Sequence, residues 1–304
     1  MPELPDVAVY IERLAALLSG QVLEQARLKS PFLLRTFEPP LVQAQGLRLC
    51  GFRRIGKRIV FEFEGELFLV FHLMIAGRFH LKAKGDPLAT KSALLGLDFA
   101  EHTLLLSEAG SKRRASLHVV AGEESLEQFA RGGLEVLGAT LAEFQEALVL
   151  ENRTLKRALT DPRLFSGIGN AYSDEILHAA QLSPVKLTRS LSETEVARLH
   201  RATENVLRAW IVRLRLEVGA GFPEHVTAFR PEMAVHGRFQ KPCPVCGMPV
   251  QRISYAANEL NYCPNCQTGG KLLADRGLST LLKSDWPKSL EELEEYKAVR
   301  RTPR

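Results

Sequence analysis

The spacing of apolar residues along the chain changes its period twice. Between Val7 and Leu18 the apolar side chains recur at helical spacing, and Gly20 ends the run. From residue 22 to residue 120 the apolar residues form short runs of β type, separated by turn residues. Beyond Thr140 the spacing becomes helical again. The pattern therefore predicts a helix, then a set of strands, then a helical region.

The β-type stretch is predicted to form an antiparallel sandwich. Residues 58–63 and 67–71 flank the connection Glu64-Gly65-Glu66, which has the length and the glycine of a hairpin loop. Successive short strands with turn signals between them are typical of such sandwiches. Further strands are expected at residues 78–82, 93–99, 102–107 and 114–120.

The helical region is predicted to precede a compact cysteine-rich module. Ser192 and Glu195 have the spacing of a capping box at the start of its longest helix, and residues 219–221 end that helix with glycines. Residues 121–138 are expected to form a helix followed by a linker. Helices are expected at residues 141–149, 154–159, 171–181 and 193–218.

The composition is that of a globular protein with a basic surface. The 304 residues are 45% hydrophobic and 25% charged, and the length suffices for two or more domains. A net charge of +5 fits a polyanionic partner. Acidic residues break any signal-peptide pattern at the start, and the longest apolar stretch, residues 67–77, is too short to span a bilayer. We expect a soluble cytoplasmic monomer, nucleoid-associated in a bacterium, without a membrane partner or a nucleotide cofactor.

Four of the five cysteines form two CxxC pairs, Cys243/Cys246 and Cys263/Cys266, and 16 residues separate the pairs. Two such pairs joined by a hairpin bring four thiolates into a tetrahedral zinc site. Cysteines in this pattern are typical of a metal site in a reducing compartment rather than of a disulfide framework. The spacing predicts one structural Zn²⁺ ion, whose four closed positions leave no room for catalysis by the metal.

The first residues carry candidate covalent chemistry. Removal of the initiator Met would leave Pro2 with a free secondary amine beside the carboxylate of Glu3. Such an amine attacks an aldehyde-like carbon to form an iminium, and a neighbouring carboxyl can move the protons. Taken alone, a terminal segment of this kind is more often a frayed end.

A glycine turn precedes one of the predicted helices. Gly167-Ile168-Gly169-Asn170 would let the backbone approach a ligand, and the helix N-terminal amides suit an anion such as a DNA phosphate. Asn170 could cap the helix or donate to that phosphate. The alternative interpretation is a tight connection between two helices.

These three pieces together resemble the formamidopyrimidine-DNA glycosylase/endonuclease VIII family. Residues 2–5 look like its amino-terminal signature, residues 167–177 like its helix-two-turn-helix, and residues 236–238 with both CxxC pairs like its zinc finger. The resemblance covers roughly residues 2 to 267, in the family's order.

The resemblance implies an α+β multidomain fold. It comprises an N-terminal antiparallel β-sandwich with a flanking helix, a C-terminal helix-two-turn-helix domain, and a β-hairpin zinc finger. The expected parts are the catalytic sandwich domain at 1–130, a linker at 131–140, the helix-two-turn-helix domain at 141–235, the zinc finger at 236–267, and a C-terminal tail extension at 268–304.

The implied function is base-excision repair of damaged DNA by a glycosylase with β or β,δ abasic-site lyase activity, on oxidised or ring-opened bases. Pro2 would attack the anomeric carbon as the nucleophile that forms the Schiff base, and Glu3 would shuttle protons. Lys57 matches a lysine near the lesion phosphates, and His72 and Asn170 match further phosphate contacts. A solvated lysine and a hydrogen-bonded core histidine are the alternatives for Lys57 and His72.

Several positions depart from the family pattern where the family fills the gap left by a flipped base. Arg113 keeps the family arginine and Ile75 aligns with the gap-filling methionine, but the wedge aromatic is replaced by Ala115. Asp6 replaces a glutamate and is one methylene shorter, and Ser92 replaces a DNA-contacting histidine.

Further departures lie in the second half of the chain. Asn258 stands where the zinc hairpin has an arginine, and Arg252 on the opposing arm is a candidate substitute for DNA binding. Residues 219–235 lack the longer loop that covers oxidised guanine in some family members.

Two other functions stay open. Ile75 and Ala115 also fit an abasic-site lyase with little glycosylase activity, and a non-catalytic damaged-DNA-binding protein would not need Pro2 and Glu3. The preferred base, the opposite base, strand preference and the type of elimination are left undecided. The departures lead us to expect weak excision of 8-oxoguanine opposite cytosine and stronger action on distorted lesions.

Overall fold

The computed structural model describes residues 1–304 except 111, 256–257, 275–286, 288, 291 and 293–304. The predicted tail extension at 268–304 lies largely outside the described residues. The chain forms two compact units: Met1–Gly133 with Leu207–Ala228, and Leu134–Val206 with Phe229–Arg304. Residues 207–228 are thus grouped with the first unit, whereas the sequence-based limits, which remain a prediction, place them with the helical domain.

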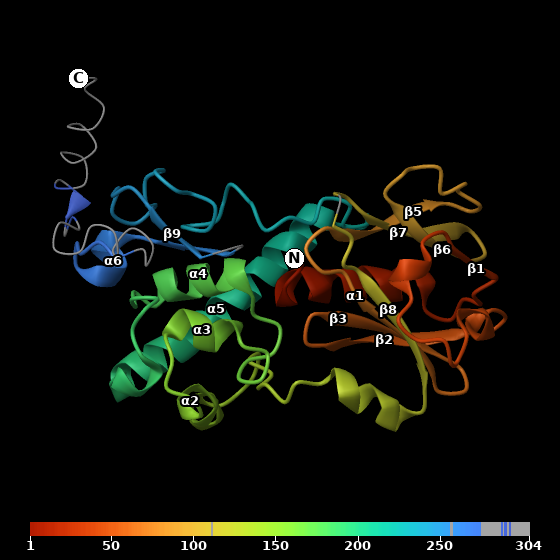
Figure 1. Ribbon diagram of the computed structural model, residues 1–304, viewed down its shortest axis with the longest axis horizontal. Coiled ribbons are helices and arrows are strands. Elements are labelled where there is room, and N and C mark those ends of the chain that lie inside the picture. Colours follow the sequence, from red (N-terminus) through yellow and green to blue (C-terminus); the bar gives the residue numbers. More distant parts are fainter. Residues whose placement is uncertain (111, 256–257, 275–286, 288, 291, 293–304) are drawn as a thin grey trace, which may run out of the picture. The chain divides into compact units, whose positions relative to one another are not determined.

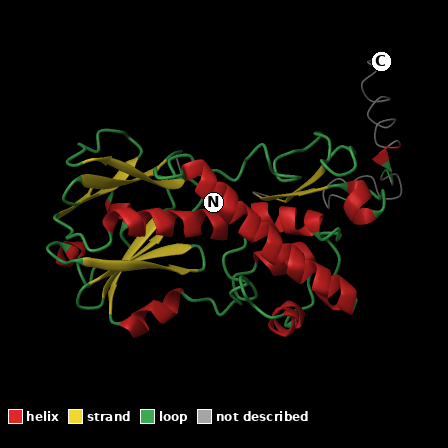
Figure 2. Ribbon diagram, turned by 180° about the vertical axis from the view of Figure 1, so that it is seen from behind, coloured by secondary structure: helices red, strands yellow, loops and turns green. Residues whose placement is uncertain are grey.

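The first unit is an antiparallel β-sandwich with a flanking helix, as predicted (Figure 1). Its two four-stranded sheets have the orders β1-β6-β7-β5 and β2-β3-β4-β8. Figure 2 shows them as two separate layers of yellow strands. The elements are α1 (Leu4–Leu18), β1 (Gln25–Leu28), 3-10 helices at Pro31–Leu33 and Leu41–Ala44, β2 (Leu49–Ile55), β3 (Arg58–Phe63), β4 (Leu67–His72), β5 (Gly77–Ala83), β6 (Ala93–Asp98), β7 (His102–Glu108), β8 (Ser116–Ala121) and a 3-10 helix at Glu123–Phe129.

One apolar core joins both sheets to α1. Phe61 on β3 and Phe71 on β4 lie 5.8 and 5.2 Å from Phe79 on β5, measured between ring centroids. Tyr10 of α1 meets Phe79 edge to face at 5.9 Å, and Leu14 is fully buried in the same cluster. Burial of each such side chain contributes about 1.5–3 kcal/mol, so α1 is anchored firmly along its inner face. Because α1 is anchored, Glu3 at its N-terminus has a defined position.

The helix expected within residues 121–138 is a short 3-10 helix, Glu123–Phe129. Its buried apolar residues, Leu126 and Phe129, are three positions apart. That spacing puts both on one face of a 3-10 helix, in which side chains at i and i+3 eclipse one another.

The second unit contains the predicted helices and hairpin, except that α5 (Glu193–Val218) is grouped with the first unit from Leu207 onward. The capping box of α5 is present: the Ser192 N–H donates to Glu195 Oε2 at 2.9 Å, and the Glu195 N–H donates to Ser192 Oγ at 3.3 Å. None of the helices within the described ranges has both the length and the apolar character of a membrane span. The remaining elements are α2 (Leu141–Val149), α3 (Leu155–Thr160), α4 (Asn170–Ala179), a 3-10 helix at Thr188–Ser190, α5 (Glu193–Val218), β9 (Gln251–Tyr255), β10 (Asn258–Tyr262) and α6 (Pro264–Thr268).

Candidate active site and zinc centre

The amino-terminal residues are buried at the start of α1. Glu3 is the N-cap residue and is only 3% exposed, and Asp6 is 4% exposed. The two form a capping box in which the Glu3 N–H donates to the Asp6 carboxylate at 3.0 Å. Asp6, although one methylene shorter than the family glutamate, therefore still reaches the backbone of Glu3. The amino-terminal segment is part of the folded structure and not a frayed end.

The terminal amine lies among four charged groups. Burial lowers the pKa of the Met1 amine, the charges of Glu3 and Asp6 oppose that change, and those of Arg78 and Lys57 reinforce it. A lowered pKa increases the fraction of amine in the neutral, nucleophilic form. The negative charge of Glu3 acts on the amine, so its carboxylate lies in the neighbourhood of the amino terminus.

Arg78 is a site residue that the sequence did not single out. Its Nε donates to the Val226 carbonyl at 2.5 Å, and its Nη1 donates to the carbonyls of Gly77 at 2.6 Å and Ile75 at 3.1 Å. Burial lowers the pKa of this guanidinium, and electrostatic interactions with Tyr10 and Asp6 oppose that change. An arginine at the start of a strand looks like any solvated cation, so only the folded chain reveals its place beside the amine.

Lys57 and His72 come from neighbouring hairpins of one sheet. Lys57 lies in the two-residue turn between β2 and β3, where Gly56 takes a φ of +61°, as the first position of a type II′ turn requires. His72 ends β4 opposite Arg58 of β3. Burial lowers the pKa of His72 to about 4, and the positive charges of Arg58 and Lys57 contribute. The structure thus gathers cations around the amino terminus, which favours a polyanionic ligand.

The lowered pKa of His72 predicts acid sensitivity of the fold. An unfolded histidine takes up its proton near pH 6.5, whereas folded His72 does so only near pH 4. The unfolded state binds more protons between these values, so stability falls as the pH drops through this window, by up to about 3 kcal/mol. His72→Gln should remove that loss, measured by urea unfolding at pH 7 and pH 4.5. An NMR titration of His72 with a midpoint near 6.5 would contradict the prediction.

The predicted gap-filling residues differ in their exposure. Ile75 is 63% exposed in the turn between β4 and β5. That turn needs Gly77, because a Cβ there would lie 2.3 Å from the Leu73 carbonyl oxygen. Arg113 is exposed, and its Nη2 donates to the Lys91 carbonyl.

Ala115 is buried in the sandwich core at 4% exposure. Its N–H donates to the buried Glu108 carboxylate at 3.0 Å, and the Arg114 N–H donates to the same group at 2.9 Å. Glu108 therefore fixes the backbone here, and the methyl of Ala115 faces inward. Direction as well as size prevents this position from wedging into DNA.

Asn170 is the first residue of α4, its side chain is only partly buried, and Gly169 is the N-cap. Asn170 is therefore not the N-cap residue of α4, because Gly169 occupies that position. The turn before the helix needs a glycine at position 167, where φ is +81°. Ser173 Oγ donates to the Gly169 carbonyl at 2.5 Å, which ties the turn to the helix.

The four predicted zinc ligands converge. Cys243 and Cys266 have their sulfurs 3.9 Å apart, Cys246 and Cys263 have theirs 3.4 Å apart, and all four sulfurs lie within 4.8 Å of one another. Tetrahedral coordination with Zn–S bonds of about 2.3 Å separates sulfurs by about 3.8 Å, which these distances match. His178 Nε2 lies 3.2 Å from the Cys243 sulfur as an outer partner. The cysteines are the ligands of one structural zinc ion, as predicted.

In the absence of a metal ion, the pKa values of the cysteine thiols shift in opposite directions. Burial raises the pKa of Cys263 to about 11. Burial also acts to raise that of Cys246, but hydrogen bonds from Met248 and the neighbouring thiols lower it to about 7. A bound zinc ion stabilises every one of them as a thiolate, so metal binding releases protons.

Arg252 and Asn258 lie on the two strands of the zinc hairpin. The Arg252 guanidinium is exposed, lies 4.6 Å from the centre of the Phe239 ring, and reaches Glu259 at 3.5 Å. Asn258 begins β10, and its side chain lies outside the described part of the chain. Both roles in DNA binding stay predictions.

The predicted residues divide between the two units. Pro2, Glu3, Lys57 and His72 belong to the first, as do Ile75 and Arg113, whereas Asn170, Arg252, Asn258 and the four cysteines belong to the second.

Comparison with known families gives three matches along the chain. They are the formamidopyrimidine-DNA glycosylase N-terminal domain over residues 1–113, the formamidopyrimidine-DNA glycosylase H2TH domain over residues 136–216, and a zinc finger found in FPG and IleRS over residues 240–269.

Individual relatives extend these matches over most of the chain. The formamidopyrimidine-DNA glycosylase of Thermus thermophilus is 35% identical over 288 residues, which cover 89% of this chain and 100% of that protein. The solved structure of MutM (Fpg) from the same organism has a TM-score of 0.74 at 33% identity, covering 88% of this chain and 98% of that one. A Lactococcus lactis FPG mutant in complex with a Fapy-dG containing DNA has a TM-score of 0.76 at 26% identity, covering 88% and 100%. The chain therefore belongs to the formamidopyrimidine-DNA glycosylase family.

Proposed function

We propose that the protein is a bifunctional DNA glycosylase and abasic-site lyase of base-excision repair, with Pro2 as its nucleophile once Met1 is removed. The observation that carries this proposal is the amino terminus, where Pro2 and Glu3 are buried and the charges of Glu3, Lys57 and Arg78 act on the terminal amine. The names of the relatives support the reaction class. One related Lactococcus lactis structure is a complex with DNA containing Fapy-dG, and another contains an abasic site.

The chemistry follows from the amine and its neighbour. The lone pair of the Pro2 nitrogen bonds to C1′ of the damaged nucleotide as the glycosidic bond breaks, and the leaving base takes a proton from water. The proton on the Pro2 nitrogen passes to Glu3, which delivers it to the sugar ring oxygen. The C1′–O bond of the ring then breaks, and the freed lone pair of the nitrogen forms the iminium. The iminium accepts the electrons of the C2′–H bond when that proton is removed, which expels the 3′ phosphate by β-elimination.

His72 is suited to hold a phosphate as a neutral donor. Its Nδ1 accepts the Met74 N–H at 3.3 Å, so the ring proton of the neutral form is on Nε2. Lys57 brings positive charge to the same region, since it contributes to the lowered pKa of His72. The pair therefore offers one charged and one uncharged phosphate contact.

The lesion class follows from the gap-filling positions. Holding a base outside the helix costs a few kcal/mol of unstacking, which inserted side chains offset. Ile75 is exposed enough to insert, whereas Ala115 is buried. A lesion that stays well stacked, such as 8-oxoguanine opposite cytosine, is therefore a poor substrate. Ring-opened purines, ring-saturated pyrimidines, hydantoins and abasic sites are better ones.

The test is borohydride trapping on matched duplexes that each carry one lesion, with an abasic site included. We expect an adduct at Pro2, and trapping of 8-oxoguanine at least about tenfold slower than that of a hydantoin. An adduct on a lysine, or none on abasic DNA, overturns the mechanism. Trapping on abasic DNA alone would favour the lyase with little glycosylase activity. A rate for 8-oxoguanine equal to that for a hydantoin refutes only the lesion preference.

A further inference from the structure

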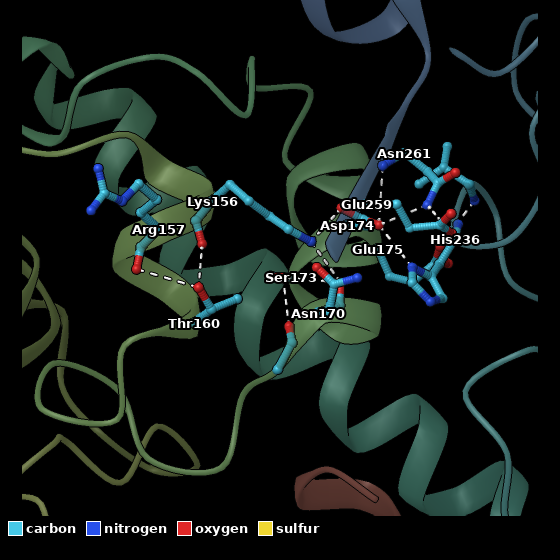
Figure 3. A network of polar contacts seen from close by, with 12 residues as sticks. Lys156, Arg157, Thr160, Asn170, Ser173, Asp174, Glu175, His236, Glu259 and Asn261 are labelled. Atoms are coloured by element: carbon cyan, nitrogen blue, oxygen red, sulfur yellow. Dashed lines mark hydrogen bonds and ion pairs between the residues drawn. The ribbon is translucent and has the colours of Figure 1, made fainter. Parts of the chain in front are cut away.

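A buried polar network in the second unit joins the start of α4 to the zinc hairpin (Figure 3). Its centre is Asp174, which is 1% exposed. One carboxylate oxygen of Asp174 accepts from Lys156 Nζ at 2.5 Å. The other accepts from His236 Nδ1 at 2.8 Å, and from the backbone N–H and the side-chain amide of Asn261, both at 3.2 Å. One side chain thus connects three separate segments.

Lys156 connects the network to the first residue of α4, Asn170. It is 8% exposed, and besides Asp174 its Nζ binds the backbone carbonyl of Asn170 at 2.6 Å. A buried ammonium is strongly unfavourable unless a carboxylate neutralises it. Asp174 therefore allows Lys156 to bind the first peptide of α4, which adjoins the Cα that carries the Asn170 side chain.

The opposite side of the network belongs to the zinc module. Asn261 is on β10, two residues before the zinc ligand Cys263. The neighbouring acid on α4, Glu175, accepts the backbone N–H groups of residues 234 to 236, at 2.6, 2.9 and 2.9 Å. Two adjacent carboxylates of α4 therefore hold the chain on both sides of the first CxxC pair, including His236.

We propose that Asp174 is a positioning residue that couples the folded zinc module to the phosphate contact of Asn170. The hairpin places the donors of His236 and Asn261, these donors orient the Asp174 carboxylate, and Asp174 with Lys156 sets the first peptide of α4. The inference rests on the proposed role of Asn170 as a phosphate contact. It assigns the network to DNA binding and not merely to holding the unit together.

A double-mutant cycle tests the coupling on the full zinc-loaded chain. His236→Leu removes the donor to Asp174 but keeps an apolar partner for Phe229, whose ring stacks on His236 at 5.7 Å. We expect His236→Leu and Asn170→Ala each to weaken binding to a duplex with a tetrahydrofuran abasic analogue by about tenfold. The double variant should also lose about tenfold, because both changes remove the same contact. His236→Asn keeps a donor near the position of Nδ1 and should restore most of the affinity.

A merely structural role gives a different pattern. If the two losses multiply to about a hundredfold, or if His236→Leu binds as the wild type does, the proposal is overturned. Lys156→Met with Asn170→Ala forms a second cycle, which decides the matter should His236→Leu lose its zinc. Borohydride trapping of the wild type on abasic DNA separates the two hypotheses: normal trapping with additive losses refutes the coupling alone, and absent trapping refutes the proposed function.

Discussion

Glu3→Gln will slow base excision by about 10²–10⁴-fold and abasic-site cleavage by clearly less. Gln has the same shape and can still accept the N–H of Asp6, so the capping box and α1 remain intact. What is lost is a proton carrier beside the terminal amine. Base release depends more on proton transfer than elimination from an abasic site does, because the leaving base and the sugar oxygen both need protons. Single-turnover rates on a ring-opened purine and on an abasic site measure the two losses.

The matched control is Glu12→Gln. Glu12 lies on the same helix, but its carboxylate binds Arg215 at 2.6 Å on an exposed surface. The control should excise and cleave as the wild type does. Equal losses on both substrates for Glu3→Gln would place Glu3 in a step common to both reactions, and unchanged rates would remove it from the mechanism.

Local signals in the sequence predicted their structures well. The capping box of Ser192 and Glu195 needs only a three-residue spacing, and it is present at the start of α5. Convergence of the cysteines likewise follows from two short CxxC turns and one hairpin. In such cases the interacting residues are close in the sequence, so their spacing is enough to predict how they are arranged in the structure.

Other site features depend on contacts between distant residues, which spacing does not reveal. Arg78 is placed by the carbonyl of Val226, a residue 148 positions away. Asp174 meets Asn261 at a separation of 87 positions. For Ala115 the sequence showed that an alanine replaces the family's wedge aromatic, and the structure adds that this residue is buried, with its backbone N–H bound to Glu108. These relations arise from the packing of whole elements and require the fold itself.

Removing zinc will unfold the hairpin and greatly weaken DNA binding while the β-sandwich unit stays folded. The zinc module has a small apolar cluster, in which Val235 and Val250 pack against the ligand cysteines. Structural zinc sites of this kind contribute about 10–16 kcal/mol of binding free energy at pH 7, and such a cluster cannot replace it. Without the metal ion Cys263 is a protonated thiol at neutral pH, since burial raises its pKa to about 11, and it no longer binds a cation as a thiolate. The sandwich has its own core, built around Phe61 and its neighbours.

Chelation of the purified protein, followed by hydrogen exchange, measures this directly. Peptides from residues 240–269 should lose protection, whereas those from residues 58–72 should keep it. Cys246→Ser should behave as the chelated protein does, and Cys50→Ser is its matched control, because Cys50 is an exposed cysteine outside the cluster. Far less than one zinc ion per wild-type chain, or a hairpin that stays protected after chelation, would show that the module folds without the metal. If the sandwich peptides lose protection as well, the two units do not fold independently, and the loss of DNA binding cannot be assigned to the hairpin.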